Sequence, residues 1–116
     1  MELFKNTLFI NLDHRKDRLE HVTEEFKKMN ITAERVNAIK RDVGAIGCTL
    51  SHIKCLEIAK KRDYDYVFIC EDDIYFKDPT LLKQNLEKFH TNSKMNWDVL
   101  IIGGNNARPY QIVEEY

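Results

Sequence analysis

The chain has 116 residues, of which 43% are hydrophobic and 32% charged, values that suit one soluble globular domain spanning residues 1–116. Lysine and arginine number 18 against 19 for aspartate and glutamate, so the net charge is −1. A chain with so little net charge has no overall field to hold nucleic acid or an anionic membrane. Any anionic ligand must therefore be met by local groups.

Residues 7–12 (TLFINL) have the apolar run of a buried strand. Asp13 is predicted to cap a following helix, whose core positions recur at helical spacing. These core positions are Leu19, Val22, Phe26 and Met29. Residues 32–39 alternate weakly and predict a second, shorter strand.

Gly44 and Gly47 open a predicted helix over residues 46–62. Its apolar side is predicted to carry Ile46, Leu50, Ile53, Leu56 and Ala59. Residues 66–70 form the next strand, continuously apolar as strands covered on both faces are.

Asp78 and Pro79 then predict the start of a helix, because aspartate caps helices and proline favours their first turn. This helix would pack through Leu82, Leu86 and Phe89. A last strand is expected over residues 98–102, before Gly103 and Gly104.

This alternation of strands and helices predicts an α/β fold with a mostly parallel sheet and helices on both faces. Ligands of such sheets collect at the carboxyl ends of the strands. Asp13, residues 71–73 and Gly103-Gly104 all follow predicted strands, so we expect them at that edge.

No segment has the length of a signal-peptide core or a membrane span, because the apolar run near the start covers only six residues. We therefore expect a cytoplasmic protein without a membrane span. Cys48 and Cys55 lie about 10 Å apart along one predicted helix, too far for a disulfide. The three cysteines are expected to be reduced, buried thiols.

The most informative stretch is residues 67–76 (VFICEDDIYF), in which three carboxylates end an apolar strand. Adjacent strand residues point to opposite faces, so Glu71 and Asp73 would share a face and Asp72 would point away. Two such acids suit a divalent cation with oxygen ligands. A solvated acidic loop without a ligand is the plain alternative.

Two other enzyme classes fit the acids less well. A strand-end acid of an ATPase requires a glycine-rich phosphate loop ending in Gly-Lys-Ser/Thr, which the sequence lacks. A glycosidase usually places its two carboxylates on separate segments, several ångströms apart.

Three separated blocks resemble glycosyltransferase family 25, which includes bacterial lipooligosaccharide galactosyltransferases and collagen β-galactosyltransferases. The blocks are Asn11-Leu12 with Arg15-Lys16-Asp17-Arg18, then residues 44–52 (GAIGCTLSH), then Glu71-Asp72-Asp73. The resemblance implies the Rossmann-like GT-A fold, a UDP-sugar donor (usually UDP-galactose), a divalent metal (Mn²⁺ or Mg²⁺) and transfer with inversion to a glycan or protein acceptor.

Residue by residue, the resemblance implies that Glu71 and Asp73 form the acidic pair of a DXD-like motif and hold the metal. Arg15 and Arg18 would bind the donor or brace the acidic loop, with a solvated helix face as the alternative. The other implied donor-binding residues are Asn11, Leu12, Ser51, His52 and Asp72. Ser51 and His52 could instead be structural groups bonded to backbone, and no catalytic base is identified.

Family members continue well beyond the strand expected at residues 98–102, so the chain is expected to be only the donor-binding part of the fold. The second hypothesis is therefore a non-catalytic nucleotide-sugar-binding or assembly module. A short sheet would leave an edge and an apolar face uncovered. We accordingly expect a homo-oligomer or a C-terminal segment that covers them.

Overall fold

The computed structural model describes residues 2–92 and 96–104, and the chain divides into two compact units, Met1–Pro79 and Thr80–Tyr116. The first unit holds most of the secondary structure. Its elements are the 3-10 helix η1 (Glu2–Phe4), strands β1 (Thr7–Asn11), β2 (Ala33–Asn37) and β3 (Phe68–Glu71), and helices α1 (Lys16–Met29) and α2 (Gly44–Lys61). Helix α3 (Pro79–Asn92) begins at the last residue of the first unit and otherwise belongs to the second.

The three strands form one parallel sheet in the order β2-β1-β3. Thr7 at the start of β1 pairs in register with Ala33 on one side and Phe68 on the other. The predicted α/β class is confirmed, as a small Rossmann-like unit. The carboxyl ends of all three strands meet at one edge of the sheet.

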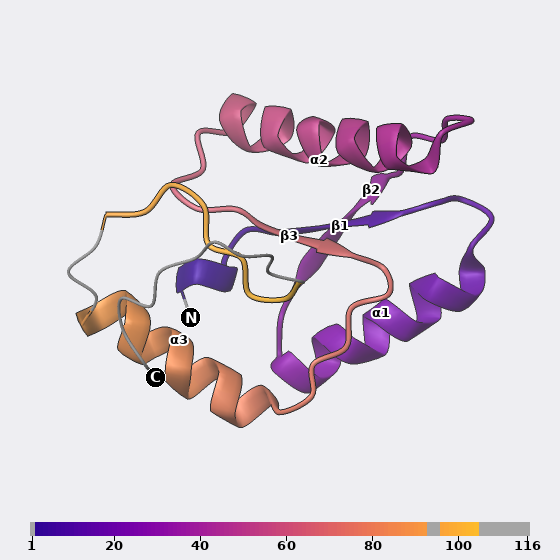
Figure 1. Cartoon of the computed structure of the whole chain (residues 1–116). Helices are drawn as coiled ribbons and strands as arrows, with labels where there is room; N and C mark the ends of the chain where they lie inside the picture. Colours follow the sequence, from indigo (N-terminus) through magenta and orange to yellow (C-terminus); the bar gives the residue numbers. More distant parts are fainter. Residues whose placement is uncertain (1, 93–95, 105–116) are drawn as a thin grey trace. The chain divides into compact units, whose positions relative to one another are not determined.

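Helices α1 and α2 lie on opposite sides of this sheet (Figure 1). The chain crosses from β1 to β2 in one direction and from β2 to β3 in the other. Right-handed crossovers in opposite directions place their helices on opposite faces. Both helices begin near the carboxyl edge, because each follows a strand that ends there.

On the α1 side the sheet packs through large side chains. The Phe26 ring lies 5.5 Å from that of Phe9 and 6.2 Å from that of Phe76, centroid to centroid. Val22 and Met29 are also buried, so this face of α1 is the one predicted from the apolar spacing. Leu19 is only partly buried.

On the α2 side the helix packs through small side chains. Gly47, Ser51, Cys55 and Ala59 recur every four residues and are its buried positions. Cys55 joins a core cluster with Leu8, Ile10 and Val36.

The face predicted for α2 was therefore wrong in part, because of the predicted residues only Ala59 is buried. Ile46 is 51% exposed, Leu56 is 54% exposed, and Ile53 is also exposed. Close approach of the helix backbone to the chain beneath it explains the difference. A Cβ on Gly47 would lie 2.6 Å from the backbone oxygen of Ile39, so a large residue cannot occupy this face.

Two further predictions about local structure were wrong. Asp13 does not cap α1: Arg15 is the N-cap residue, with no side-chain cap hydrogen bond, and the Asp13 carboxylate instead lies 2.9 Å from Arg35. Residues 98–102 form no strand, and Val99 is 77% exposed. An apolar run favours a strand only where a neighbouring strand supplies pairing and burial, and propensity alone does not provide these.

Helix α3 begins at Pro79, as the Asp-Pro pair predicts. Leu86 is buried in it, while Leu82 and Phe89 are partly buried. The Phe89 ring lies 6.1 Å from that of Trp97, centroid to centroid.

Candidate donor-binding site

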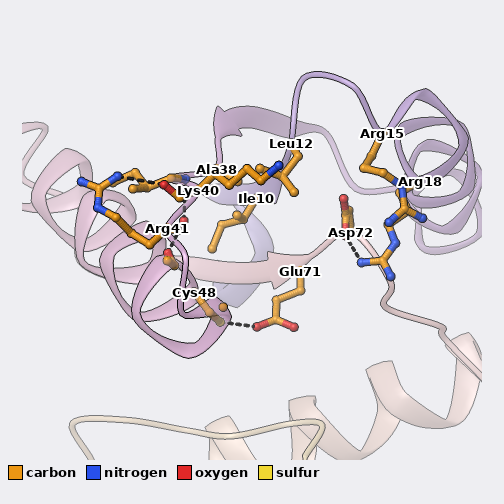
Figure 2. Close-up of a pocket in the computed structure, with 14 residues that line it drawn as sticks. Ile10, Leu12, Arg15, Arg18, Ala38, Lys40, Arg41, Cys48, Glu71 and Asp72 are labelled. Atoms are coloured by element: carbon orange, nitrogen blue, oxygen red, sulfur yellow. Dashed lines mark hydrogen bonds and ion pairs between the residues drawn. The ribbon is translucent and has the colours of Figure 1, made fainter.

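A pocket of about 290 Å³ opens at the carboxyl edge of the sheet, where β1 and β3 end and α2 begins (Figure 2). Among the residues that the structure describes, all that line it belong to the first unit. The lining residues are Ile10, Leu12, Arg15, Arg18, Ala38, Ile39, Lys40, Arg41, Gly44, Gly47, Cys48, Ser51, Glu71 and Asp72. The pocket therefore lies where ligands of open parallel sheets bind.

Asp72 faces the α1 side of the pocket and is held there by two contacts. Asn11 donates a hydrogen bond from Nδ2 to Oδ2 of Asp72 at 2.8 Å. A guanidinium nitrogen of Arg18 lies 3.3 Å from Oδ1. Asp72 is buried, so this carboxylate is stabilised by paired and hydrogen-bonded groups rather than by water. Of the two roles predicted for Arg18, the geometry fits bracing of the acidic turn.

The Asn11 amide is itself oriented by Arg35 from the neighbouring strand. Arg35 donates to Oδ1 of Asn11 at 2.9 Å and to its backbone oxygen at 3.0 Å. These bonds place the amide oxygen toward Arg35 and the amide nitrogen toward Asp72. Asn11 is buried and fully engaged, which makes it a positioning residue for the acidic turn.

Glu71 points to the other side, toward the first turns of α2 (Figure 2). The Cys48 thiol donates a hydrogen bond to Oε1 of Glu71 at 3.2 Å, and Nε2 of His52 lies 3.2 Å from the same oxygen. The contacts with Cys48 and then His52 lower the pKa of Glu71 below its usual value. The same hydrogen bond, followed by burial and the charges of Glu71 and Asp73, raises the pKa of the Cys48 thiol.

Ser51 has a structural role at the base of the pocket. Its hydroxyl accepts a hydrogen bond from the backbone N–H of Ile39 at 2.8 Å and donates one to the backbone oxygen of Gly47 at 2.7 Å. This matches the alternative in which the serine is bonded to backbone. His52, in contrast, contacts a side chain, that of Glu71.

Three side chains of α1 contact the backbone of the segment after β3 and hold it in place. The Glu25 carboxylate accepts a hydrogen bond from the backbone N–H of Phe76 at 2.9 Å. Lys28 donates to the backbone oxygen of Phe76 at 3.2 Å. Nε2 of His21 lies 2.8 Å from the backbone oxygen of Ile74. Burial raises the pKa of Glu25, but Lys28 and the Phe76 N–H outweigh it and leave that pKa lowered.

Most of the residues expected at the site gather around this pocket. Six of the nine expected site residues line the pocket, and Asn11 and His52 contact lining residues. Asp73 is exposed in the turn and is not among the lining residues. As alternation predicts, Asp72 faces away from Glu71, but both still border the same pocket.

Four polar or charged side chains at or beside the site were not expected there from the sequence. Lys40 and Arg41 line the pocket from the segment before α2, and Arg35 orients Asn11. Lys40 and Arg41 follow β2 and Arg35 lies within it, and basic residues at such positions are too common to predict a site. Cys48 was expected to be buried and is exposed, whereas Cys55 and Cys70 are buried; all three are free.

The comparison with family models assigns the chain. A model described as "Glycosyltransferase family 25 (LPS biosynthesis protein)" matches residues 41–110, more than half of the chain. The chain belongs to glycosyltransferase family 25. The match includes both the 44–52 block that opens α2 and the acidic residues 71–73, so the family's signal spans the α2 side of the pocket.

A curated relative agrees with the family assignment. A Haemophilus influenzae protein named "Putative glycosyltransferase" is 34% identical over an alignment of 88 residues, covering 57% of this chain and 31% of that protein. The chain thus spans less than a third of the length of this relative. Among the described residues, no helix is long and apolar enough to cross a membrane.

A divalent cation fits the α2 side of the pocket better than the α1 side. Asp72 is already engaged by Asn11 and Arg18. Glu71 is half exposed, and its contacts with Cys48 and His52 both use Oε1. Carboxylate oxygens of this kind are the ligands that Mg²⁺ and Mn²⁺ prefer.

Proposed function

We propose that this pocket binds the UDP-sugar donor of a metal-dependent hexosyltransferase, with UDP-galactose as the expected donor. The observation that carries the proposal is that Glu71 and several basic side chains line one pocket at the carboxyl ends of parallel strands, in a chain of family 25. A nucleotide diphosphate requires both kinds of group, since its phosphates attract cations and a bound metal needs carboxylates.

Basic groups beside the start of α2 would hold the diphosphate. Arg15, Lys40 and Arg41 all line the pocket, as does Gly44 in the first turn of the helix. The N-terminus of a helix carries a partial positive charge and attracts phosphate groups. Arg15 forms an ion pair with the Asp17 carboxylate at 2.8 Å, which orients its guanidinium group.

Glu71 and Asp73 would hold the cation, with its remaining ligands coming from phosphate and water. A cation bound there supplies positive charge that stabilises the departing diphosphate. Asp72, Asn11 and Arg18 would keep the acidic turn in place. The acceptor is expected to be a hydroxyl group of a glycan or a protein.

Calorimetric titration of the purified chain with UDP and with UDP-galactose tests this function. Each ligand is titrated with Mn²⁺ and again with chelator, and binding is expected only with the metal. Glu71→Gln and Asp73→Asn should abolish the metal-dependent binding and leave the fold intact, because both carboxylates are half exposed or exposed.

Glu57→Gln is the matched control, since Glu57 lies on the same helix as Cys48 and His52, is exposed and does not line the pocket. It should bind like the unchanged chain. Equal affinity with metal and with chelator, or unaltered affinity in Glu71→Gln, would contradict the proposed role of the acidic pair.

A further inference from the structure

Cys48, His52 and Glu71 form a cluster of metal-ligating side chains on the α2 side of the pocket. Their ligand atoms, one from each residue, all lie within 4.8 Å of one another. Cys48 and His52 are four residues apart on α2, so they occupy the same face of the helix. Glu71 meets them from the end of β3.

Two of the three spacings are close to those of a tetrahedral metal site. Sγ of Cys48 and Nε2 of His52 each lie 3.2 Å from Oε1 of Glu71. Ligand atoms bound to one Zn²⁺ at its usual bond lengths are roughly 3.4–3.6 Å apart. Binding would widen these two distances slightly and bring Sγ and Nε2, which lie within 4.8 Å of each other, to a similar spacing, a small adjustment for side chains that are partly exposed.

The chemistry of the three ligands selects the kind of ion. Thiolate and imidazole favour zinc and similar transition metals, whereas Mg²⁺ and Mn²⁺ prefer oxygen ligands. Three protein ligands leave the fourth position of a zinc ion open, as in catalytic rather than structural zinc sites. Cys48 and Glu71 line the pocket, so that position can be reached by a ligand entering it.

We propose that Cys48, His52 and Glu71 form a three-ligand site for Zn²⁺ or a similarly thiophilic divalent cation. The Cys48 sulfur binds the metal as a thiolate, and its proton, now hydrogen-bonded to Glu71, is released to solvent. Glu71 exchanges this hydrogen bond for a bond to the metal. The site needs no nucleotide, so it does not rest on the proposed donor binding.

Glu71 belongs both to this cluster and to the proposed donor site, so the two sites compete for it. A thiophilic cation on Glu71 would take the carboxylate away from the oxygen-bound cation that accompanies the UDP-sugar. Zn²⁺ is therefore expected to inhibit Mn²⁺-dependent UDP binding, and Cys48→Ser is expected to relieve that inhibition.

Titration of the purified chain with Co²⁺ alone, followed by absorption spectroscopy, tests the site. Binding should give the charge-transfer band of a cobalt thiolate together with the intense visible bands of tetrahedral Co²⁺, and Zn²⁺ should displace both. Loss of residues that only support metal ligands typically weakens binding about 10–100-fold, so loss of a ligand in His52→Ala should weaken it by at least about 100-fold.

Cys48→Ser should remove the charge-transfer band, and His14→Ala is the matched control for His52→Ala, because His14 is exposed and outside the pocket. Circular dichroism and thermal unfolding verify that each variant folds. The proposal is overturned if folded protein shows no thiolate band, or if Cys48→Ser or His52→Ala leaves Co²⁺ affinity unchanged. Failure of UDP to bind would leave this result untouched, which separates the two proposals.

Discussion

The two faces of the sheet are packed by opposite means. On the α1 face, Phe9, Phe26 and Phe76 fill the space between helix and sheet with large rings. On the α2 side, Gly47 lets the helix backbone approach that of Ile39, and the small Cys55 packs against residues of the sheet. Arg18 of α1 contacts Asp72 in the acidic turn, whereas Cys48 and His52 of α2 contact Glu71. The way each helix packs thus decides what surrounds each carboxylate.

The largest effect is expected from removing a ring on the α1 face. Phe26→Ala deletes a buried side chain that contacts two other rings and should lower the free energy of unfolding by about 3–5 kcal/mol. Leu56→Ala on the outer side of α2 is the control, because Leu56 is exposed and should change stability by less than about 0.5 kcal/mol. Urea unfolding measures both; equal losses would contradict the packing of Phe26 between α1 and the sheet.

A smaller loss of stability is expected when a methyl group is added to the buried side of α2. Gly47→Ala places a Cβ 2.6 Å from the Ile39 backbone oxygen and should cost about 1–3 kcal/mol, because helix and loop must separate. Separation should also weaken the contact of Cys48 with Glu71. Gly44→Ala meets nothing within 4 Å and should be neutral or stabilising. Thermal unfolding of the two variants decides whether close approach governs this face.

Removing the side chain that holds the acidic turn should lower stability by an amount similar to or smaller than that for Gly47→Ala. Asp72→Ala removes one of the two acceptors of the buried Asn11 amide nitrogen and the partner of Arg18, which should cost about 1–3 kcal/mol. Asp13→Ala removes an exposed partner of Arg35 and should cost less than about 1 kcal/mol. If the two variants unfold at the same urea concentration, Asp72 does not brace the turn.

The smallest effect concerns pH. The folded-state pKa of Glu71 is lowered by Cys48 and His52, so its stabilising contribution is present above the unfolded value of 4.5 and is lost as pH falls through the folded pKa. Glu71→Gln should therefore lose stability less steeply than the unchanged chain below pH 4.5. Because the side chain is half exposed, solvent screening keeps the difference small. Parallel acid titrations with identical slopes would contradict the contacts of Glu71.

The contrast between the faces also explains what the sequence could predict. On α1, core residues are large and apolar, so the spacing of Val22, Phe26 and Met29 predicted the buried side correctly. On α2, the buried residues include a glycine and a serine, which carry no apolar signal, and the larger Ile46 and Leu56 pointed to the wrong side. How small residues pack depends on how closely another segment approaches the helix. The spacing of apolar residues carries no information about that approach.

The site was predictable in its location and less so in its details. Strand ends and the acidic run predicted Glu71 and Asp72 at the carboxyl edge, because parallel strands share that edge. The contact of Cys48 with Glu71 depends on how closely α2 approaches the sheet. The strand expected at residues 98–102 failed for a related reason, since an apolar run does not specify a pairing partner.

The most direct test of the central claim is to map the metal and nucleotide on the chain by NMR. With UDP present, traces of paramagnetic Mn²⁺ should broaden the backbone amide signals of Glu71, Cys48 and Leu12, and Glu71→Gln should suppress the effect. The broadening should fall off steeply toward the opposite edge of the sheet, at Asn6 and Tyr66. Broadening centred on that opposite edge, or none that depends on UDP, would contradict the assignment of the pocket as the donor site.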